Sequence, residues 1–239
     1  MSTLTLVRHA QASFFAKNYD ELSVLGQKQA QLLGEFWARR QIDFDKVYCG
    51  PRVRQRHTAE IAGSACTQAG RTWREPVVLA ELDEYDLIGI FHGLAPELSR
   101  HDAGFAELMA CFRRDENGPD RNRSFQKMFE ALTTHWATTT TEVAGVESFP
   151  AFRQRVQRCL RRVMEGKRSG RRVAVFTSGG VIGTAVRLAL DAPNRMALEL
   201  NWRVRNSSLT EFVFTKDRFN LDSFNAIPHL EDSELWTYW

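Results

Sequence analysis

The sequence predicts a three-layer α/β/α fold, in which helices cover both faces of a mostly parallel sheet. Short β-branched and aliphatic runs at 3–7, 46–49 and 172–177 are typical of buried strands. Amphipathic helical patterns separate these runs, and strands that alternate with helices favour parallel pairing. The stretch 87–148 has helical patterns and no convincing strand, so we expect a helical insertion there.

Length and composition limit the class of protein. The 239 residues can bury a sizeable core, and we expect one domain over 1–239. A hydrophobic content of 43% and a charged content of 26% are typical of soluble globular proteins. The net charge of +3 is too small to indicate nucleic acid or a membrane as a partner. The oligomeric state cannot be derived from the sequence.

The cysteines and the N-terminus indicate a compartment. The four cysteines are widely spaced and form no CxxC pair, which argues against a zinc site or a disulfide framework. The first residues already form a strand-like run without a signal-peptide pattern, and no apolar run has the length of a membrane span. We therefore expect a cytoplasmic protein.

The first third of the chain alternates strands and helices. A loop through 18–20 leads to Ser23, which is a plausible N-cap for a helix with apolar side chains at helical spacing. The second strand, 46–49, runs through Gly50-Pro51 into a helix that contains Arg54. A third apolar run, 76–79, leads into an acidic segment that contains both Glu81 and Glu84.

The insertion contains two helical patterns joined by a polar linker at 113–123. Its aromatic side chains could line a pocket, but their helical spacing favours packing in a core. These side chains are Phe91, Phe105, Phe125 and Trp136. A threonine run at 138–141 reads as a loop before the chain returns to the sheet.

The last third returns to strands and helices. The helix 152–164 has one apolar face and one arginine-rich face, which we interpret as solvated rather than as a binding surface for an acidic partner. Arg171 belongs to the same basic cluster. The strand 172–177 ends at Ser178-Gly179-Gly180, where a helix begins, and strand patterns follow at 209–214 and 219–224.

Polar groups that suit a phosphate gather at the strand ends, where α/β sheets bind ligands. Arg8 and Arg54 offer forked donors, and the glycine turn at 178–180 offers backbone amides at a helix start. His9 can act as a nucleophile and Glu84 as an acid and base. Arginines can carry the charge of a phosphoryl group, so this chemistry requires no metal or other cofactor.

These elements together resemble the histidine phosphatase superfamily, the phosphoglycerate mutase-like group. Leu6-Val7-Arg8-His9-Ala10 is similar to the N-terminal Arg-His-Gly motif, with alanine in place of glycine. Gly50 to Ala59 is similar to Ser-Pro-x-x-Arg-x-x-x-Thr-Ala, and Leu82-Asp83-Glu84 to Leu-x-Glu. Val175 to Val181 matches Val-x-x-His-Gly-Gly-Val except at Ser178, and 206–208 and 225–230 fit the closing segment.

The resemblance implies a role for each matching residue. His9 is the expected phosphorylated nucleophile, and Arg8, Arg54, Ser178 and Gly179 are the expected phosphate-binding residues. Glu84 is the favoured acid and base. Glu81 competes with it, because Leu79-Ala80-Glu81 has the same Leu-x-Glu form. The implied substrate is a small phosphomonoester, whose identity the sequence does not reveal.

Ser178 stands where the family has a second histidine, and three interpretations remain. In the first, the serine hydroxyl and the Gly179 and Gly180 amides suffice for a phosphatase with reduced turnover. In the second, another histidine replaces the missing one. In the third, the chain binds a phosphorylated ligand without turnover. The candidate replacements are His57, His92 and His229. A mutase is less favoured, because nothing in the sequence indicates a retained phosphoenzyme. The sequence does not support a serine-hydrolase role for Ser178, because it lacks the G-x-S-x-G motif there.

Overall fold

The computed structural model describes residues 1–13, 20–139, 143–166 and 168–238. The chain forms two compact units, one of residues 1–84 and 155–239 and one of residues 85–154. The expected insertion at 87–148 falls inside the second unit. Of the expected loop at 18–20, only Asp20 lies within the described residues, and 140–141 of the threonine run also lie outside them.

A six-stranded mixed sheet forms the centre of the first unit, with the order β3-β2-β4-β1-β5-β6. The strands are β1 (Ser2–Arg8), β2 (Lys46–Cys49), β3 (Val77–Val78), β4 (Arg172–Thr177), β5 (Leu209–Phe214) and β6 (Phe219–Ala226). The first four pair in parallel, and β5 and β6 pair antiparallel at one edge. The predicted α/β fold class is confirmed.

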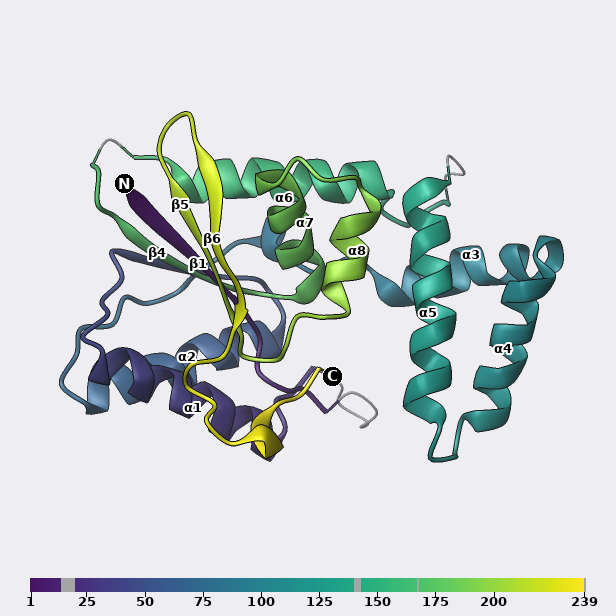
Figure 1. The fold of residues 1–239 in the computed structure, drawn as a ribbon, viewed down its shortest axis with the longest axis horizontal. Helices are drawn as coiled ribbons and strands as arrows, with labels where there is room; N and C mark the ends of the chain where they lie inside the picture. Colours follow the sequence, from purple (N-terminus) through teal and green to yellow (C-terminus); the bar gives the residue numbers. More distant parts are fainter. Residues whose placement is uncertain (14–19, 140–142, 167, 239) are drawn as a thin grey trace. The chain divides into compact units, whose positions relative to one another are not determined.

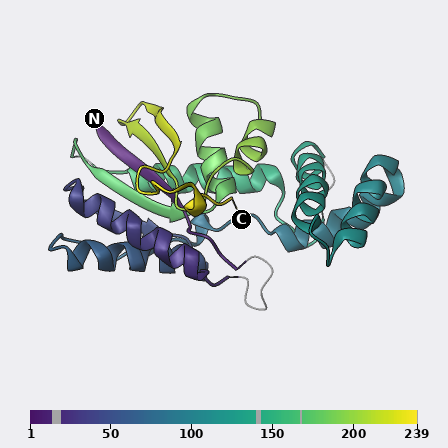
Figure 2. The ribbon, with the colours of Figure 1, turned by 60° about the horizontal axis from the view of Figure 1, so that its bottom comes forward.

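Helices cover both faces of this sheet (Figures 1 and 2). On one face lie α1 (Val24–Arg39) and α2 (Val53–Gln68), and on the other α7 (Gly179–Ala189) and α8 (Arg195–Asn201). The predicted cap is confirmed, since the Ser23 hydroxyl accepts a hydrogen bond from Gly26 N at 3.0 Å. Trp37 of α1 packs edge-on against Phe176 of β4, with ring centroids 6.0 Å apart. The sequence pattern did not predict α8.

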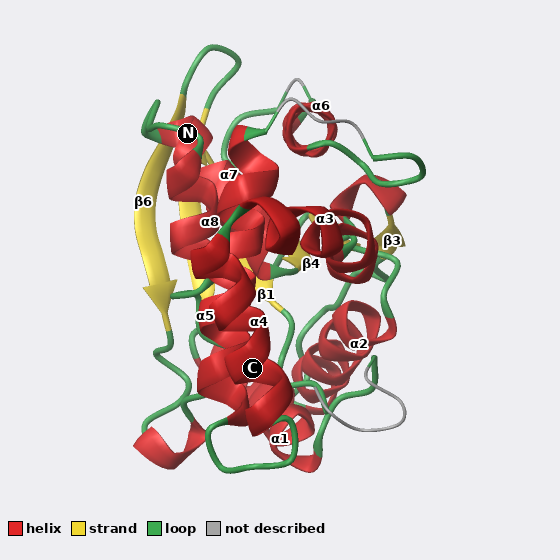
Figure 3. Cartoon of the chain, turned by 90° about the vertical axis from the view of Figure 1, so that its right-hand side faces the viewer, coloured by secondary structure: helices red, strands yellow, loops and turns green. Residues whose placement is uncertain are grey.

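The described residues of the second unit form helices and loops only (Figure 3). They contain α3 (Leu87–His101), α4 (Ala103–Asp115), α5 (Arg121–Thr138) and the start of α6 (Phe149–Met164). The sequence pattern did not predict α3, because Gly89, Gly93 and Pro96 lower its helix propensity. Its N-cap is nevertheless strong, since Asp86 accepts a hydrogen bond from Gly89 N at 3.0 Å.

The aromatic side chains of the second unit pack mainly against one another. The Phe91 and Phe129 rings stack with centroids 5.9 Å apart, and Phe125 lies 4.7 Å from Phe129. Trp136 is buried against Phe149, and its indole N–H donates to the Glu147 carbonyl at 3.0 Å. Core packing, the favoured interpretation, is therefore confirmed for Phe125 and Trp136, while Phe105 is buried and also lines a pocket of this unit.

The arginine-rich face of α6 is only partly solvated. The expected apolar face is buried, as predicted. Arg155, however, donates from one nitrogen to the carbonyls of Glu81 and Asp83, at 2.8 and 2.9 Å. Arg171 is buried and donates to the Met164 and Glu165 carbonyls, which end α6. The solvated interpretation is wrong for these two residues, because the ends of α6 and of the 3-10 turn at 80–82 offer carbonyls that need donors.

No helix among the described residues is both long and apolar enough to cross a membrane.

Candidate active site

The carboxyl ends of three parallel strands meet at one edge of the sheet in the first unit. β1 and β4 pair in a register that sets Arg8 opposite Thr177. The backbone N–H of His9 donates to the Thr177 carbonyl at 2.8 Å, and that of Gly50 donates to the Phe176 carbonyl at 3.0 Å. The sheet thus brings together the residues that follow β1, β2 and β4.

His9 follows β1 and is held in one tautomer. Its side chain is buried, and Nδ1 lies 2.9 Å from the Ala10 carbonyl oxygen. A carbonyl can only accept, so Nδ1 carries the hydrogen. Nε2 therefore has a lone pair, and it accepts a hydrogen bond from Arg54 Nε at 3.1 Å. A neutral imidazole with its Nε2 lone pair toward an arginine can act as a nucleophile.

The surroundings of His9 favour the neutral ring. Burial lowers its pKa well below the usual value, and the positive charges of Arg54 and Arg8 lower it further. The sheet end therefore combines two guanidinium groups with an imidazole that stays unprotonated at neutral pH.

The Arg54 guanidinium is buried in the first turn of α2. One of its terminal nitrogens pairs with Asp20 Oδ1 at 2.8 Å, while Asp20 Oδ2 accepts from Val53 N at 2.8 Å. A single carboxylate thus caps the helix and holds the arginine. The Arg8 guanidinium donates to the Val204 carbonyl, which ties it to the loop before β5.

The structure separates the two candidate glutamates. Glu84 Oε2 accepts a hydrogen bond from Gly180 N at 2.9 Å, at the start of α7. Glu81 instead pairs with Arg162 of α6 at 3.0 Å, and both side chains are substantially exposed. Glu81 lies within the short 3-10 turn at Ala80–Leu82, and Glu84 follows that turn. Glu84 therefore meets the glycine turn that follows β4, which keeps it the favoured acid and base.

Ser178 is buried at the N-cap position of α7. Its hydroxyl makes no capping bond to its own helix, and it accepts a hydrogen bond from Gln55 Nε2 at 2.8 Å. The Gly180 amide is already used by Glu84. Gly179 packs against α8, where an added Cβ would lie 2.1 Å from Asn201 Oδ1. The binding of phosphate by Ser178 and Gly179 stays a prediction.

A comparison with protein families agrees with this arrangement. The model of the histidine phosphatase superfamily, branch 1, matches residues 4–132 and 100–227. The chain belongs to this superfamily.

Proteins that this chain resembles in sequence or in fold include a phosphoglycerate mutase-like protein, a mutase and a phosphatase. "Phosphoglycerate mutase-like protein 4" of Arabidopsis thaliana is 25% identical over 238 residues, which are 96% of this chain and 87% of that protein. The structure is similar to that of a phosphoglycerate mutase from Bacillus anthracis, with a TM-score of 0.63 and 19% identity over 96% of this chain and 95% of that one. It is also similar to a mycobacterial glucosyl-3-phosphoglycerate phosphatase, with a TM-score of 0.62 and 21% identity over 94% and 98% of the two chains.

The candidate replacements for the missing histidine differ in their surroundings. His57 is exposed on α2, with Nε2 4.0 Å from Glu60 Oε2, and His92 is exposed on α3. His229 is buried, and its Nε2 lies 2.9 Å from the Ser207 hydroxyl. Burial lowers the pKa of His229 to about 4, so it is neutral at pH 7. Among the bonds described here, none joins these histidines to His9 or Ser178.

Three polar residues that were not predicted as site residues support the predicted ones. Asp20 holds Arg54, Gln55 holds Ser178, and the Asn206 amide donates to the His9 carbonyl at 3.2 Å. Each partner lies far away in sequence, so periodicity gives no signal for the pairing. Asn206 falls in a matching segment of the family and could have been singled out on that basis.

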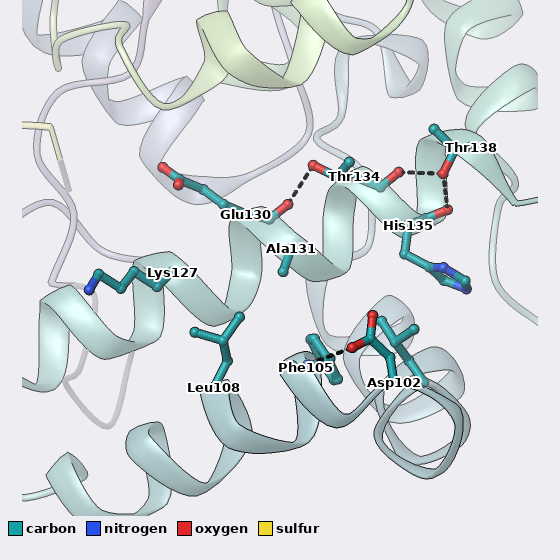
Figure 4. A pocket seen from close by; sticks show the side chains of 11 residues that line it. Asp102, Phe105, Leu108, Lys127, Glu130, Ala131, Thr134, His135 and Thr138 are labelled. Carbon is teal, nitrogen blue, oxygen red and sulfur yellow. Dashed lines mark hydrogen bonds between the residues drawn. The ribbon is translucent and has the colours of Figure 1, made fainter.

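The second unit has an open pocket of about 710 Å³, lined by residues of α3, α4 and α5 (Figure 4). Phe105, Lys127 and His135 are among its lining residues. None of the predicted site residues lines it. Across the described parts of the chain, no group of three or more His, Cys, Asp and Glu side chains is arranged to hold a metal ion.

Proposed function

We propose that this histidine phosphatase superfamily member hydrolyses a small phosphomonoester through a phosphohistidine on His9. The observation that carries the proposal is the tautomer of His9. Its Nδ1–H is held by a backbone carbonyl, and its Nε2 lone pair lies beside the Arg54 guanidinium. The nucleophilic nitrogen of His9 and the anion-binding guanidinium of Arg54 are thus in direct contact.

In the first step, Nε2 of His9 attacks phosphorus and forms a P–N bond while the P–O bond to the alcohol breaks. The Glu84 carboxyl group gives its proton to the leaving oxygen, which departs as the alcohol. Arg8 and Arg54 bind the phosphoryl oxygens and stabilise their charge, so no step is assigned to a metal. Hydrogen bonds from Ser178 and the Gly179 amide complete the phosphate site.

In the second step, water attacks phosphorus and the P–N bond breaks. The Glu84 carboxylate accepts the proton of the water, and the Nε2 lone pair of His9 is restored. Inorganic phosphate then leaves. The hydrogen bond from Gly180 N fixes Glu84 Oε2 at the start of α7, which holds the carboxyl group in place for both steps.

Hydrolysis of an aryl phosphate tests the proposal. Wild type is expected to release phosphate and to form an acid-labile phosphoenzyme, and His9→Ala is expected to do neither. Equal rates for wild type and His9→Ala would contradict the enzyme and favour the alternative, a binding protein without turnover. That alternative draws support from Ser178, whose neutral hydroxyl supplies less charge stabilisation than an imidazolium.

A second variant distinguishes an enzyme whose rate is limited by Ser178 from a protein without activity. Ser178→His, combined with Gln55→Ala to make room beside it, is expected to raise turnover if the neutral serine limits the rate. The physiological substrate class, a small phosphorylated molecule, and the cytoplasmic location stay predictions.

A further inference from the structure

Gln55 is a fully buried polar residue that the proposed reaction does not yet use. It lies in the first turn of α2, one residue after Arg54. Its Oε1 accepts a hydrogen bond from Arg52 N at 3.2 Å, and its Nε2 donates to the Ser178 hydroxyl at 2.8 Å. Nε2 also lies 3.5 Å from the Leu82 carbonyl oxygen.

These partners determine which way the amide faces. A backbone N–H can only donate, so the atom near Arg52 N must be the carbonyl oxygen of the side chain. The carbonyl oxygen of Leu82 can only accept, so the atom near it must be the NH₂ group. Both constraints agree, and the group that faces Ser178 is therefore a donor without acceptor capacity.

The direction of this bond decides what Ser178 can do. A serine hydroxyl has one hydrogen and two lone pairs. Gln55 uses a lone pair, so the Ser178 hydrogen must be directed to another acceptor. A buried hydroxyl hydrogen at the start of α7, next to the strand end that bears His9, is suited to a phosphoryl oxygen.

The space behind Ser178 is built around this amide. A Cβ added at Gly50 would lie 2.0 Å from Gln55 Oε1, so the chain leaves room for the amide where β2 ends. Thr177 Oγ1 also donates to the Leu82 carbonyl at 2.8 Å, which holds the carbonyl that faces the Gln55 amide.

We propose that Gln55 is a positioning residue that makes the Ser178 hydroxyl a one-directional donor to the phosphoryl group. This inference rests on the proposed phosphate site at Ser178. The pair supplies a hydrogen bond without a charge, and it contains no group that titrates near neutral pH. Its contribution to binding should therefore be independent of pH.

A double-mutant cycle in the full-length protein tests the proposal, with orthovanadate binding by calorimetry and aryl phosphate hydrolysis as readouts. Ser178→Ala is expected to weaken vanadate binding about five- to tenfold. It is expected to lower kcat/KM about a hundredfold. Gln55→Met is expected to have a similar effect in wild type and less than about a twofold effect in the Ser178→Ala background. Gln31→Met, an exposed change on α1, is the matched control and should change neither readout.

Gln55→Glu provides a second variant of nearly the same shape. Its carboxylate accepts where the amide donates, so the Ser178 hydrogen turns toward residue 55 and leaves the phosphoryl group. Binding at least as weak as in Ser178→Ala is expected. Wild-type vanadate affinity in this variant, or independent effects of Gln55→Met and Ser178→Ala, would overturn the inference.

The two readouts separate this inference from the proposed function. If wild type hydrolyses nothing, the phosphatase proposal fails, while the vanadate cycle still decides the role of Gln55. A purely structural role for Gln55 would lower the thermal unfolding midpoint and weaken binding equally in both Ser178 backgrounds, which also contradicts the inference.

Discussion

Nε of Arg54 donates a hydrogen bond to Nε2 of His9 across 3.1 Å. The guanidinium therefore lies in front of the Nε2 lone pair, on the side where phosphorus must approach. In the proposed reaction, Arg54 exchanges this bond for bonds to the phosphoryl oxygens when the substrate enters. The Asp20 carboxylate, 2.8 Å from the guanidinium, keeps the arginine in place during the exchange.

Arg54→Lys is expected to lower kcat/KM for an aryl phosphate about 10²–10³-fold. A lysine ammonium cannot reproduce the planar fork that reaches both His9 and Asp20. Steady-state kinetics measure the loss. Arg56→Lys, an exposed change two residues further along α2, should leave kcat/KM within about twofold of wild type. Equal effects of the two variants would refute a specific role for Arg54.

Substitution of Glu84 and of Glu81 should change the dependence of the rate on the leaving group differently. Glu84→Gln cannot protonate the leaving oxygen, so hydrolysis of an alkyl phosphate should slow about 10²–10⁴-fold. An aryl phosphate with an acidic phenol needs little protonation, and its first step should slow much less. Single-turnover phosphoenzyme formation with both substrates measures this contrast.

Glu81→Gln is the matched control, because Glu81 pairs with Arg162 in an exposed ion pair. Such pairs contribute little, so the rates for both substrates should stay close to those of wild type. A strong, leaving-group-dependent loss in Glu81→Gln would reverse the assignment of the acid.

Arg155→Met should act on Glu84 from a distance. Arg155 donates to the carbonyls of Glu81 and Asp83, which precede Glu84 in the chain. Loss of these charge-assisted bonds should lower the free energy of unfolding by about 1–3 kcal/mol. It should also slow alkyl phosphates more than aryl phosphates, since it loosens the segment that bears the acid.

Arg158→Met, on the exposed face of the same helix, controls for the loss of a positive charge from α6. Urea unfolding and the ratio of alkyl to aryl rates are the two measurements. An unchanged ratio in Arg155→Met would limit Arg155 to a role in stability.

The sequence located the strands and the ends that bear the site, because β-branched runs such as 172–177 are a local signal. It did not reveal α3, whose glycines and proline give no such signal while an aspartate cap supports the helix. It also could not separate Glu81 from Glu84. Both have the same local pattern, and their directions depend on a 3-10 turn and on partners in α6 and α7.

The contacts that hold the site residues in place could not be predicted from the sequence either. Arg155 and Arg171 share a pattern with solvated arginines, yet they bind carbonyls that only the folded chain brings near. Gln55 and Ser178 are 123 residues apart in sequence and meet through the pairing of β2 with β4. Such contacts depend on the tertiary fold, so neither periodicity nor spacing predicts them.

Because of His229, the free energy of unfolding should decrease when the pH is lowered. Burial lowers its pKa in the folded state to about 4, compared with about 6.5 in the unfolded chain. Between these values the unfolded state binds more protons, so stability decreases as the pH falls through this range. From pH 7.5 to pH 5, His229 should account for a loss of about 2 kcal/mol in the free energy of unfolding.

His229→Gln can retain a hydrogen bond to the Ser207 hydroxyl without titrating. Urea unfolding at pH 7.5 and pH 5 should therefore show a smaller pH-dependent loss in this variant, by about 2 kcal/mol. His57→Gln, at an exposed position, should leave the loss unchanged. The burial of His9 also lowers its pKa, so part of the acid sensitivity should persist in His229→Gln and decrease further when His9 is replaced as well.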